Sequence, residues 1–177
     1  MNEREAINTN RLERATEKDV DKVFEVIKAD GDWLLKEKGL DHWSSYYTRE
    51  IMENKVKKQE VYLTYKNNEV VGTISFGEYP PDYYVLKNRE AFTDPKAKAL
   101  YLSSLAIKPE FHGQGIASDL MNFADSTAKS RGAEYVRFDC REEYGDLVNF
   151  YIKRGYKKVG SFVEEEGYNY LLMEKKV

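Results

Sequence analysis

One stretch of this sequence, Leu100–Gly132, constrains the fold more than any other. It begins with an apolar run, Leu100–Ile107, which is typical of a strand in the interior of a sheet. Lys108 and Pro109 end that strand, because proline has no N–H to donate to a β-ladder. A glycine-spaced turn follows, and a helical pattern begins directly after it. The sequence therefore predicts a strand, a tight turn and a helix in immediate succession.

Apolar residues in the second half of this stretch recur every three or four positions, which predicts an amphipathic helix. Its expected buried stripe consists of Ile116, Leu120, Ala124 and Ala128. Gly132 supplies a C-terminal stop of the kind that helices commonly use. The helix is therefore expected to begin at the glycine turn itself.

The turn between strand and helix has the properties of an anion site. The first amides of a helix lack partners within the helix, and the aligned peptide dipoles leave partial positive charge there. Gly113 and Gly115 carry no Cβ, so a bulky oxyanion can approach these amides closely. Each such contact is worth about 0.3–1 kcal/mol, and about 2 kcal/mol when partly buried. We interpret the turn as a diphosphate site; the alternative is a tight turn that binds nothing.

Two well-known phosphate loops do not fit this turn. The sequence has no Gly-x-x-x-x-Gly-Lys-Ser/Thr pattern, which argues against a nucleoside triphosphatase loop. The spacing of Gly113 and Gly115 lacks the third glycine of the dinucleotide-binding fingerprint.

The turn resembles the acyl-CoA loop of the GCN5-related N-acetyltransferase (GNAT) superfamily. That loop reads Arg or Gln, two residues, Gly, one residue, then Gly or Ala, between a strand and a helix. Gly115 and Ala117 fit this pattern, whereas His112 replaces the Arg or Gln. A second segment, Phe150–Tyr156, resembles the aromatic–Tyr–three residues–Gly–aromatic signature of the same superfamily. Tyr144 stands where the family has an asparagine.

The order of the remaining expected elements agrees with this resemblance. Thr16 is expected to cap a helix that ends near Gly31, with a short helical piece capped by Asp32 behind it. Asn67 and Asn68 are expected to form the turn of a hairpin. Further helices are expected at about 47–58 and after Asp146, which would cap its helix; the expected strands are 10–15, 61–65, 70–76, 100–107, 135–140, 157–163 and 168–174. We therefore expect an α/β (α+β) fold with a mixed central sheet flanked by helices, in one domain over residues 1–177 with residues 1–9 flexible.

The resemblance implies acetyl-CoA as cosubstrate and assigns roles to particular residues. Tyr151 would protonate the departing thiolate and contact the cofactor; as an alternative, it is a packed helix aromatic. The implied cofactor contacts are, besides Tyr151, Leu105, Ala106, Ile107, His112, Gly113, Gln114, Gly115, Ile116 and Ala117.

An amine must lose a proton before it attacks a thioester. With a lysine-like pKa, the neutral form costs roughly 4.6 kcal/mol at pH 7. Glu78 is the first candidate for the base and Asp139 the second, although each is also explained as a solvated or structural carboxylate. A water relay is a further alternative.

Aromatic residues are the candidates for an acceptor pocket. Trp33 and Trp43 lie in one segment, and Tyr83 and Tyr84 lie in the long proline-containing connection 77–99. Long connections are often binding loops, whereas single aromatics are more often ordinary packing.

Composition limits the partners and the cellular compartment that we expect for this protein. The net charge of −3 argues against a nucleic-acid partner, and no apolar run is long enough to cross a membrane. One cysteine cannot form an internal disulfide, so we expect a cytoplasmic protein with a packed, inert Cys140. His42 and His112 are isolated, so no metal site is expected. A homodimer is compatible with all of this.

These observations predict an enzyme that moves acetyl from acetyl-CoA to the primary amine of a small molecule by direct attack. Three alternatives stay open at this point: a protein or peptide N-acetyltransferase, a non-catalytic acyl-CoA-binding or regulatory domain, and an interaction module whose turn binds nothing.

Overall fold

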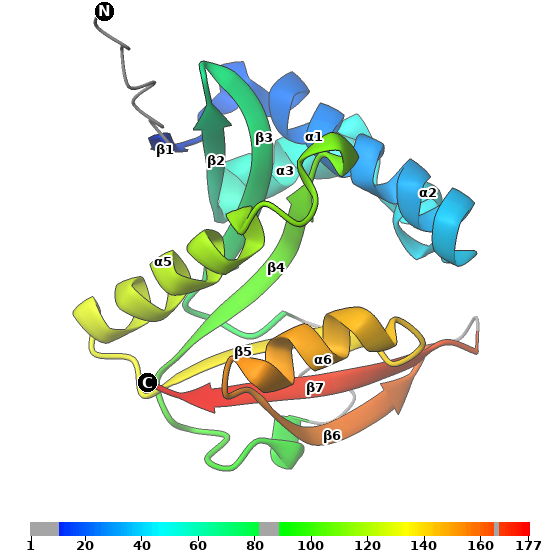
Figure 1. The fold of residues 1–177 in the computed structure, drawn as a ribbon. Coiled ribbons are helices and arrows are strands. Elements are labelled where there is room, and N and C mark those ends of the chain that lie inside the picture. Colours follow the sequence, from blue (N-terminus) through cyan, green and yellow to red (C-terminus); the bar gives the residue numbers. More distant parts are fainter. Residues whose placement is uncertain (1–10, 82–88, 165–166) are drawn as a thin grey trace, which may run out of the picture. The chain divides into compact units, whose positions relative to one another are not determined.

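The computed structural model describes residues 11–81, 89–164 and 167–177. Seven strands form a mixed sheet in the order β1-β2-β3-β4-β5-β7-β6 (Figure 1). The strands are β1 (Arg11–Arg14), β2 (Glu60–Lys66), β3 (Glu69–Gly77), β4 (Ala99–Ile107), β5 (Tyr135–Arg141), β6 (Lys157–Val163) and β7 (Asn169–Lys176). The helical segments are η1 (Glu17–Asp19), α1 (Val20–Trp33), η2 (Leu34–Lys38), α2 (His42–Tyr46), α3 (Arg49–Lys58), η3 (Arg89–Ala91), η4 (Pro109–Phe111), α5 (Ile116–Ser130) and α6 (Gly145–Lys153).

The strands pair in both directions, which confirms the expected mixed sheet. Strand β4 is parallel to β5, with Ala99 opposite Tyr135. Three other pairs are antiparallel: β1 with β2 (Arg11 opposite Tyr65), β5 with β7 (Arg137 opposite Glu174) and β6 with β7 (Lys157 opposite Glu174).

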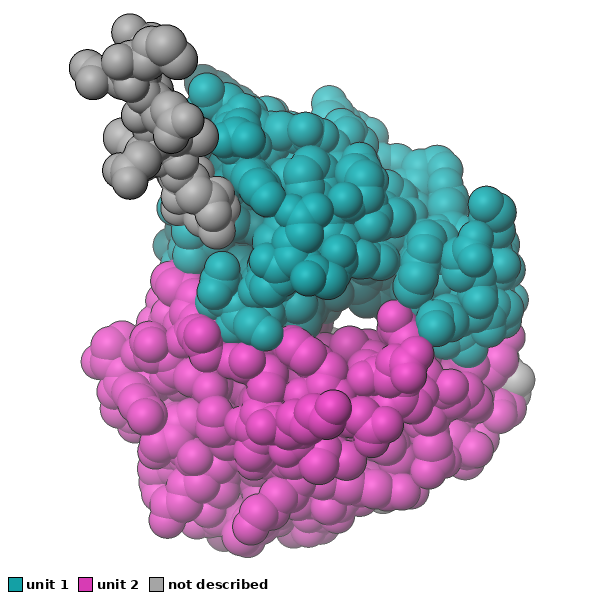
Figure 2. Space-filling model, viewed as in Figure 1, with its two compact units in different colours: residues 1–75, 104–120 teal, residues 76–103, 121–177 magenta. Residues whose placement is uncertain are grey.

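The chain divides into two compact units (Figure 2). Unit 1 contains Met1–Ser75 and Ser104–Leu120, and unit 2 contains Phe76–Ser103 and Met121–Val177. The expectation of one domain over residues 1–177 stays a prediction. In the part of the chain that the structure describes, no helix has both the length and the apolar character needed to cross a bilayer.

Unit 1 has its core between its helices and its strands (Figure 1). Val23 and Ile27 of α1 and Met52 of α3 pack with Val61 and Leu63 of β2 in one buried cluster. The burial of these apolar positions explains why α1 and α3 lie against the sheet.

The expected hairpin and the expected central helix are both confirmed. Asn67 and Asn68 connect β2 to β3 with positive φ angles of 50° and 66°, the conformation that a two-residue hairpin turn requires. Helix α5 starts directly after the glycine turn, and its predicted stripe is buried.

The predicted helix end near Gly31 agrees with the structure to within two residues, whereas the predicted cap at Asp32 is wrong, because Asp32 lies inside α1. Helix α1 continues through Gly31 to Trp33 and passes into a π-helical turn that ends at Gly39. Gly31 serves close packing instead of helix termination, since an added Cβ would lie 3.3 Å from the Cβ of Trp43. The short α2 that carries Trp43 was not predicted.

Asp146 does not cap α6. The helix begins one residue earlier, at Gly145, and Tyr144 occupies the N-cap position without a side-chain cap hydrogen bond. Asp146 lies in the first turn instead, where a negative charge is favourable near the positive end of the helix dipole.

In unit 2, β5 is covered on both faces. Successive side chains of a strand point to opposite faces. Phe138 faces α6, with its ring centroid 4.4 Å from that of Tyr151. Arg137 faces the segment that follows η3, because its guanidinium lies 4.6 Å from the ring centroid of Phe92. The 91–94 segment and α6 therefore pack on opposite sides of the strand.

A buried ion pair holds the 91–94 segment on the sheet. Arg137 and Glu174 are 0% and 3% exposed, and Arg137 Nε donates to Glu174 Oε2 at 2.8 Å. The guanidinium also donates to the backbone carbonyl of Asp94, and Glu174 Oε1 accepts from the backbone N–H of Thr93 at 3.3 Å. Because both charged groups also bond to this segment, the pair fixes a connection that would otherwise lie loosely on the sheet.

Removal of one member of this pair should destabilise the fold strongly. We expect Arg137→Met to lower the free energy of unfolding by about 3–5 kcal/mol, because the Glu174 carboxylate would become a buried, unpaired charge. Urea unfolding followed by circular dichroism measures the change. The control is Lys57→Met, whose surface ion pair with Glu53 should matter far less. A wild-type midpoint for Arg137→Met would show that the pair does not hold the fold.

Candidate functional site

The glycine turn opens directly onto the first turn of α5. Gly113 and Gly115 have φ angles of 74° and 83°, a region that glycine enters at little cost. Both are exposed, and an added Cβ at either would meet no atom within 4 Å. The Gly115 carbonyl accepts from the backbone N–H of Asp119 at 3.0 Å, so Gly115 begins the helix. The turn therefore leaves open space beside the positive end of a 15-residue helix.

The two neighbours of Gly115 on the helix side differ in burial. Ile116 is 5% exposed and belongs to the core, whereas Ala117 is half-buried in the first turn. Gln114 is exposed, and its Oε1 accepts from Lys66 Nζ at 2.5 Å. Lys66, the last residue of β2, thus places a positive charge at the turn, which adds to the attraction for an oxyanion.

His112 is part of a hydrogen-bond network that ties the turn to α1. Its Nε2 lies 2.9 Å from the carbonyl oxygen of Ile107 and 3.2 Å from Asp30 Oδ1. Asp30 Oδ2 accepts from the backbone N–H of Ile107 at 3.3 Å. The Trp33 ring packs against His112 edge to face, with centroids 4.6 Å apart. One carboxylate therefore holds the end of β4 and the start of the turn together.

The same network raises the pKa of His112. The hydrogen bond from the imidazole to Asp30 is the main cause, because it favours the charged ring, and partial burial opposes it. The negative charges of Asp30 and Glu110 and the carbonyl of Ile107 act in the same direction as the hydrogen bond. A protonated His112 would place a further positive charge beside the turn.

Of the three β4 residues expected to contact the cofactor, Leu105 is the best placed. The backbone N–H of Lys108 donates to the carbonyl of Val71 in β3 at 2.9 Å. Backbone groups alternate in direction along a strand, so those of Ile107 and Leu105 point away from β3 and those of Ala106 point toward it. Both backbone groups of Ile107 bond to Asp30 and His112. Of Leu105, Ala106 and Ile107, only Leu105 has backbone groups that both point away from β3 and make no hydrogen bond to Asp30 or His112.

Ser104, directly before Leu105, interrupts the extended backbone of β4. Its φ angle is 52°, a left-handed conformation that costs a residue other than glycine about 1–3 kcal/mol. The side chain is 7% exposed, and its Oγ lies 2.9 Å from the hydroxyl of Tyr47. Ser104 and Tyr47 were not predicted as site residues.

Tyr151 lies on α6 in unit 2 and is 5% exposed. Its ring packs against Phe138, Phe150 and Tyr156, with centroids 4.4, 5.3 and 6.1 Å apart. This packing fixes the orientation of the phenol ring. A fixed ring is compatible with both interpretations of Tyr151, as a general acid and as a packed helix aromatic. Its role as a general acid stays a prediction.

Glu78 follows β3 and is half-exposed. Its Oε1 lies 3.8 Å from Nη1 of Arg131, at the end of α5. Glu78 thus lies beside a cation at the start of the connection to β4, and its role as a base stays a prediction.

The expected acceptor residues differ in what surrounds them. Trp43 is half-buried, packs against the unit 1 core and meets the Tyr47 ring at a centroid distance of 5.5 Å. Trp33 supports the glycine turn through His112. Tyr83 and Tyr84 lie outside the described residues.

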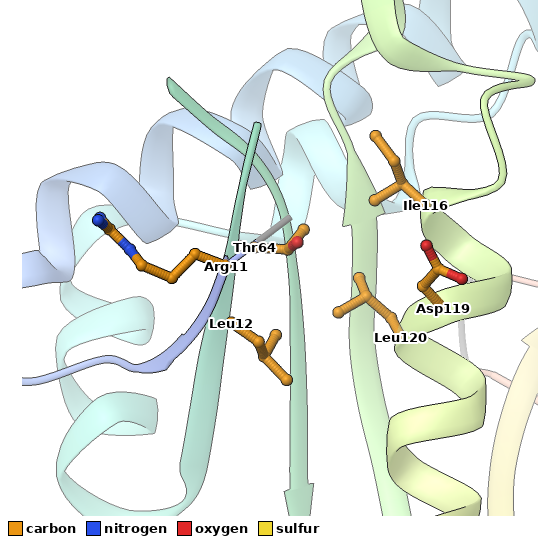
Figure 3. Close-up of a pocket in the computed structure, with 6 residues that line it drawn as sticks. All are labelled: Arg11, Leu12, Thr64, Ile116, Asp119 and Leu120. Atoms are coloured by element: carbon orange, nitrogen blue, oxygen red, sulfur yellow. The ribbon is translucent and has the colours of Figure 1, made fainter. Parts of the chain in front are cut away.

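A pocket in unit 1 lies between β1, β2 and the start of α5. Figure 3 shows it on the inner face of α5, with a volume of about 220 Å³. Its lining residues are Arg11, Leu12, Thr64, Ile116, Asp119 and Leu120. This volume is below the roughly 300–1,000 Å³ typical of small-molecule sites, and the Asp119 carboxylate would repel a diphosphate. We therefore do not place the cofactor here.

Cys140 has the buried position that the sequence predicted. It is 7% exposed, and burial raises the pKa of its thiol to about 12, so the reactive thiolate is scarce. Among the described residues, no three His, Cys, Asp or Glu side chains form a group that could hold a metal ion.

Sequence reasoning missed four residues of this region: Asp30, Tyr47, Lys66 and Ser104. Asp30 and Lys66 are single charged residues far from the turn in sequence, with no pattern around them. Tyr47 and Ser104 are 57 positions apart. Their roles follow from tertiary contacts, which spacing alone does not indicate.

Comparison with known proteins finds the same architecture elsewhere. The family model described as "Acetyltransferase (GNAT) domain" matches residues 34–177. The uncharacterized N-acetyltransferase YesJ of Bacillus subtilis (strain 168) is 22% identical over 167 residues, which cover 92% of this chain and 88% of that protein. An acetyltransferase of the GNAT family from Listeria monocytogenes 4b F2365 has a TM-score of 0.75 at 21% identity, over 95% of both chains. PaiA N-acetyltransferase from Thermoplasma acidophilum, in complex with coenzyme A, has a TM-score of 0.71 at 17% identity, over 96% of this chain and 99% of that one.

The contact between His112 and Asp30 predicts a pH dependence of stability. Because the folded state raises the pKa of His112, the contact contributes fully below about pH 6.5 and is lost as the pH rises through the folded-state pKa. We expect Asp30→Asn to return the His112 titration toward its ordinary value and to flatten the dependence of Tm on pH above 6.5. NMR titration of the imidazole signals measures the pKa, and the sequence contains only two histidines.

The matched control for this titration is Asp32→Asn. Asp32 is an exposed acid of the same helix that pairs with Lys28, so its removal should leave the His112 titration unchanged. Equal shifts in the two variants would show that the general charge of α1, and not the contact with Asp30, sets the pKa of His112.

Proposed function

The chain belongs to the GNAT acetyltransferase family, and from that premise we propose that it transfers acetyl from acetyl-CoA to the primary amine of a small molecule by direct attack. The observation that carries the proposal is the open glycine turn at the start of α5. A diphosphate, the charged group that joins the two halves of coenzyme A, fits this turn. The turn offers it helix amides, the charge of Lys66 and open space beside Gly113 and Gly115.

The fit of the turn to the cofactor rests on its own residues. Gly113 and Gly115 give the diphosphate close approach, Lys66 adds positive charge at the edge of the turn, and His112 would add a further charge when protonated. Leu105 would form backbone hydrogen bonds with the pantetheine, like those between neighbouring strands of a sheet. A protein of similar fold, PaiA N-acetyltransferase, was solved with coenzyme A, which supports the same ligand for this chain.

The chemistry requires one proton to leave the amine and one to reach the thiolate. Glu78 is our candidate for the group that takes the first proton, directly or through water, because it is a half-exposed carboxylate directly after β3. Tyr151 is our candidate for the acid, because packing on three sides fixes its phenol. The acid stabilises charge that develops only as the thioester bond breaks, so it acts on the transition state.

We place acceptor recognition in the 33–47 segment, which contributes Trp33 and Trp43, and in the connection that carries Tyr83 and Tyr84. Trp43 packs beside Tyr47, whose hydroxyl reaches β4 directly before Leu105. The segment therefore reaches the strand that we assign to the pantetheine.

The proposal is tested by thiol release from acetyl-CoA with a panel of small amines, polyamines, amino acids and peptides. We expect turnover with one or more small amines and less with peptides. A preference for peptide amino termini would overturn the small-molecule assignment and leave the family membership intact. Tight acetyl-CoA binding without turnover on any amine would overturn the proposed acceptor class as a whole.

Tyr151→Phe tests the proposed acid. We expect kcat to fall about 100-fold, at the lower end of the range for loss of a general acid, because a thiol of pKa about 8.5 is already a good leaving group. The affinity for acetyl-CoA should stay near the wild-type value, since the ring is retained. Single-turnover rates and calorimetry measure the two quantities.

The control is Tyr156→Phe, which removes a neighbouring hydroxyl that donates to Asp125 at 2.7 Å. Loss of this buried hydrogen bond should lower Tm and leave kcat unchanged. If Tyr151→Phe behaves in the same way, with a lower Tm and a wild-type rate, Tyr151 is a packing residue.

A further inference from the structure

The backbone of Ser104 is strained at a place where no turn requires it. In the described part of the chain, the other non-glycine residues with positive φ are Asn67 and Asn68, which form the β2–β3 hairpin turn. Ser104 instead lies inside β4, 7% exposed, with a φ of 52°. Strained residues that persist inside regular structure cluster at functional sites.

The Ser104 side chain meets a residue from a distant segment. Its Oγ lies 2.9 Å from the hydroxyl of Tyr47, which occupies the junction between α2 and α3. The Tyr47 ring is held edge to face by Trp43 and Tyr46, with centroids 5.5 and 5.0 Å away. Both hydroxyls are therefore fixed in position by their surroundings.

The order of residues along β4 places this pair near the reacting end of the cofactor. The diphosphate is proposed to lie at Gly113–Ala117, and β4 runs toward that turn. Moving back from Ile107 to Leu105 and Ser104 therefore leads away from the diphosphate, by about 3.3 Å per residue. The thioester lies at the end of the pantetheine far from the diphosphate, so it is expected on the Ser104 side.

We propose that the hydroxyl pair of Ser104 and Tyr47 binds the amino group of the acceptor and orients it toward the thioester. The proposal rests on the function proposed above and adds two residues to its site. A serine hydroxyl has one hydrogen and two lone pairs, so when Ser104 donates to the Tyr47 oxygen it can still accept an N–H from the amine. The amine nitrogen keeps its own lone pair for the attack.

This arrangement explains both unusual features of Ser104. The left-handed backbone turns the side chain toward Tyr47 inside a strand that would otherwise continue its regular alternation. Neutral hydroxyls bind the neutral, nucleophilic form of an amine without the strong preference for ammonium that a carboxylate would have. The pair thus positions the nucleophile, and the proton is removed by another group.

Ser104→Gly and Tyr47→Phe test the proposal. Glycine removes the hydroxyl and accepts the positive φ, and phenylalanine keeps the ring packing of Tyr47. With the panel amine that the wild-type enzyme acetylates fastest, we expect kcat/KM for the amine to fall about 5- to 100-fold in each variant, as for loss of one partner of a buried hydrogen bond. The double variant should lose little more than either single one.

Two measurements separate this role from a structural one. The dissociation constant for acetyl-CoA, from calorimetry, should stay within about twofold of wild type in both variants. Tyr62→Phe is the control, because Tyr62 lies on β2, its hydroxyl donates to Glu60 at 3.0 Å, and it has no part in the proposal. Its kinetic constants should match those of the wild type.

Failure of this inference is distinct from failure of the proposed function. A wild type that acetylates no amine would overturn both. A wild type that acetylates an amine, with unchanged kcat/KM for that amine in Ser104→Gly and Tyr47→Phe, would overturn the inference alone. A parallel loss of acetyl-CoA affinity would also overturn it, because the pair would then support the cofactor or the fold.

Discussion

The site in unit 1 depends on one carboxylate, that of Asp30. Its two oxygens meet the backbone N–H of Ile107 and the imidazole of His112, so α1, the end of β4 and the glycine turn share a single anchor. Hydrogen bonds to a charged group contribute about 1.5–3 kcal/mol each, more than the roughly 1 kcal/mol of a neutral one. The glycines of the turn have little preference for one conformation, so the position of their amides is set by the residues on either side.

Much of the fold follows from local chemistry that a sequence displays. The strand, turn and helix of Leu100–Gly132 were predicted because an apolar run, a proline, two glycines and a helical stripe follow one another, and each acts on its own neighbours. The hairpin at Asn67 and Asn68 follows from the positive φ that asparagine tolerates. Where a local signal conflicts with tertiary packing, the packing decides. Glycine commonly ends helices, yet Gly31 packs against Trp43 and α1 continues through it to Trp33.

The candidate site was predictable only in part, for the same reason. The glycine turn is a continuous motif, so its position could be predicted, whereas Asp30, Tyr47, Lys66 and Ser104 act through contacts between residues far apart in sequence. The buried pair of Arg137 and Glu174 belongs to this class as well, since charged residues on a strand usually indicate an exposed face. Family resemblance suggested the roles that we propose for Tyr151 and the turn, and the structure added the contacts that hold the turn in place.

The central claim is that the glycine turn binds the diphosphate of acetyl-CoA through the first amides of α5. Amide NMR of the ¹⁵N-labelled protein during titration with acetyl-CoA, and separately with inorganic pyrophosphate, tests it most directly. The account predicts that the amides of Gly113, Gly115 and Ile116 are among those that shift most with both ligands, and that Gly115→Glu removes these shifts. Saturable binding of acetyl-CoA that leaves the amides of residues 113–117 unshifted would contradict it.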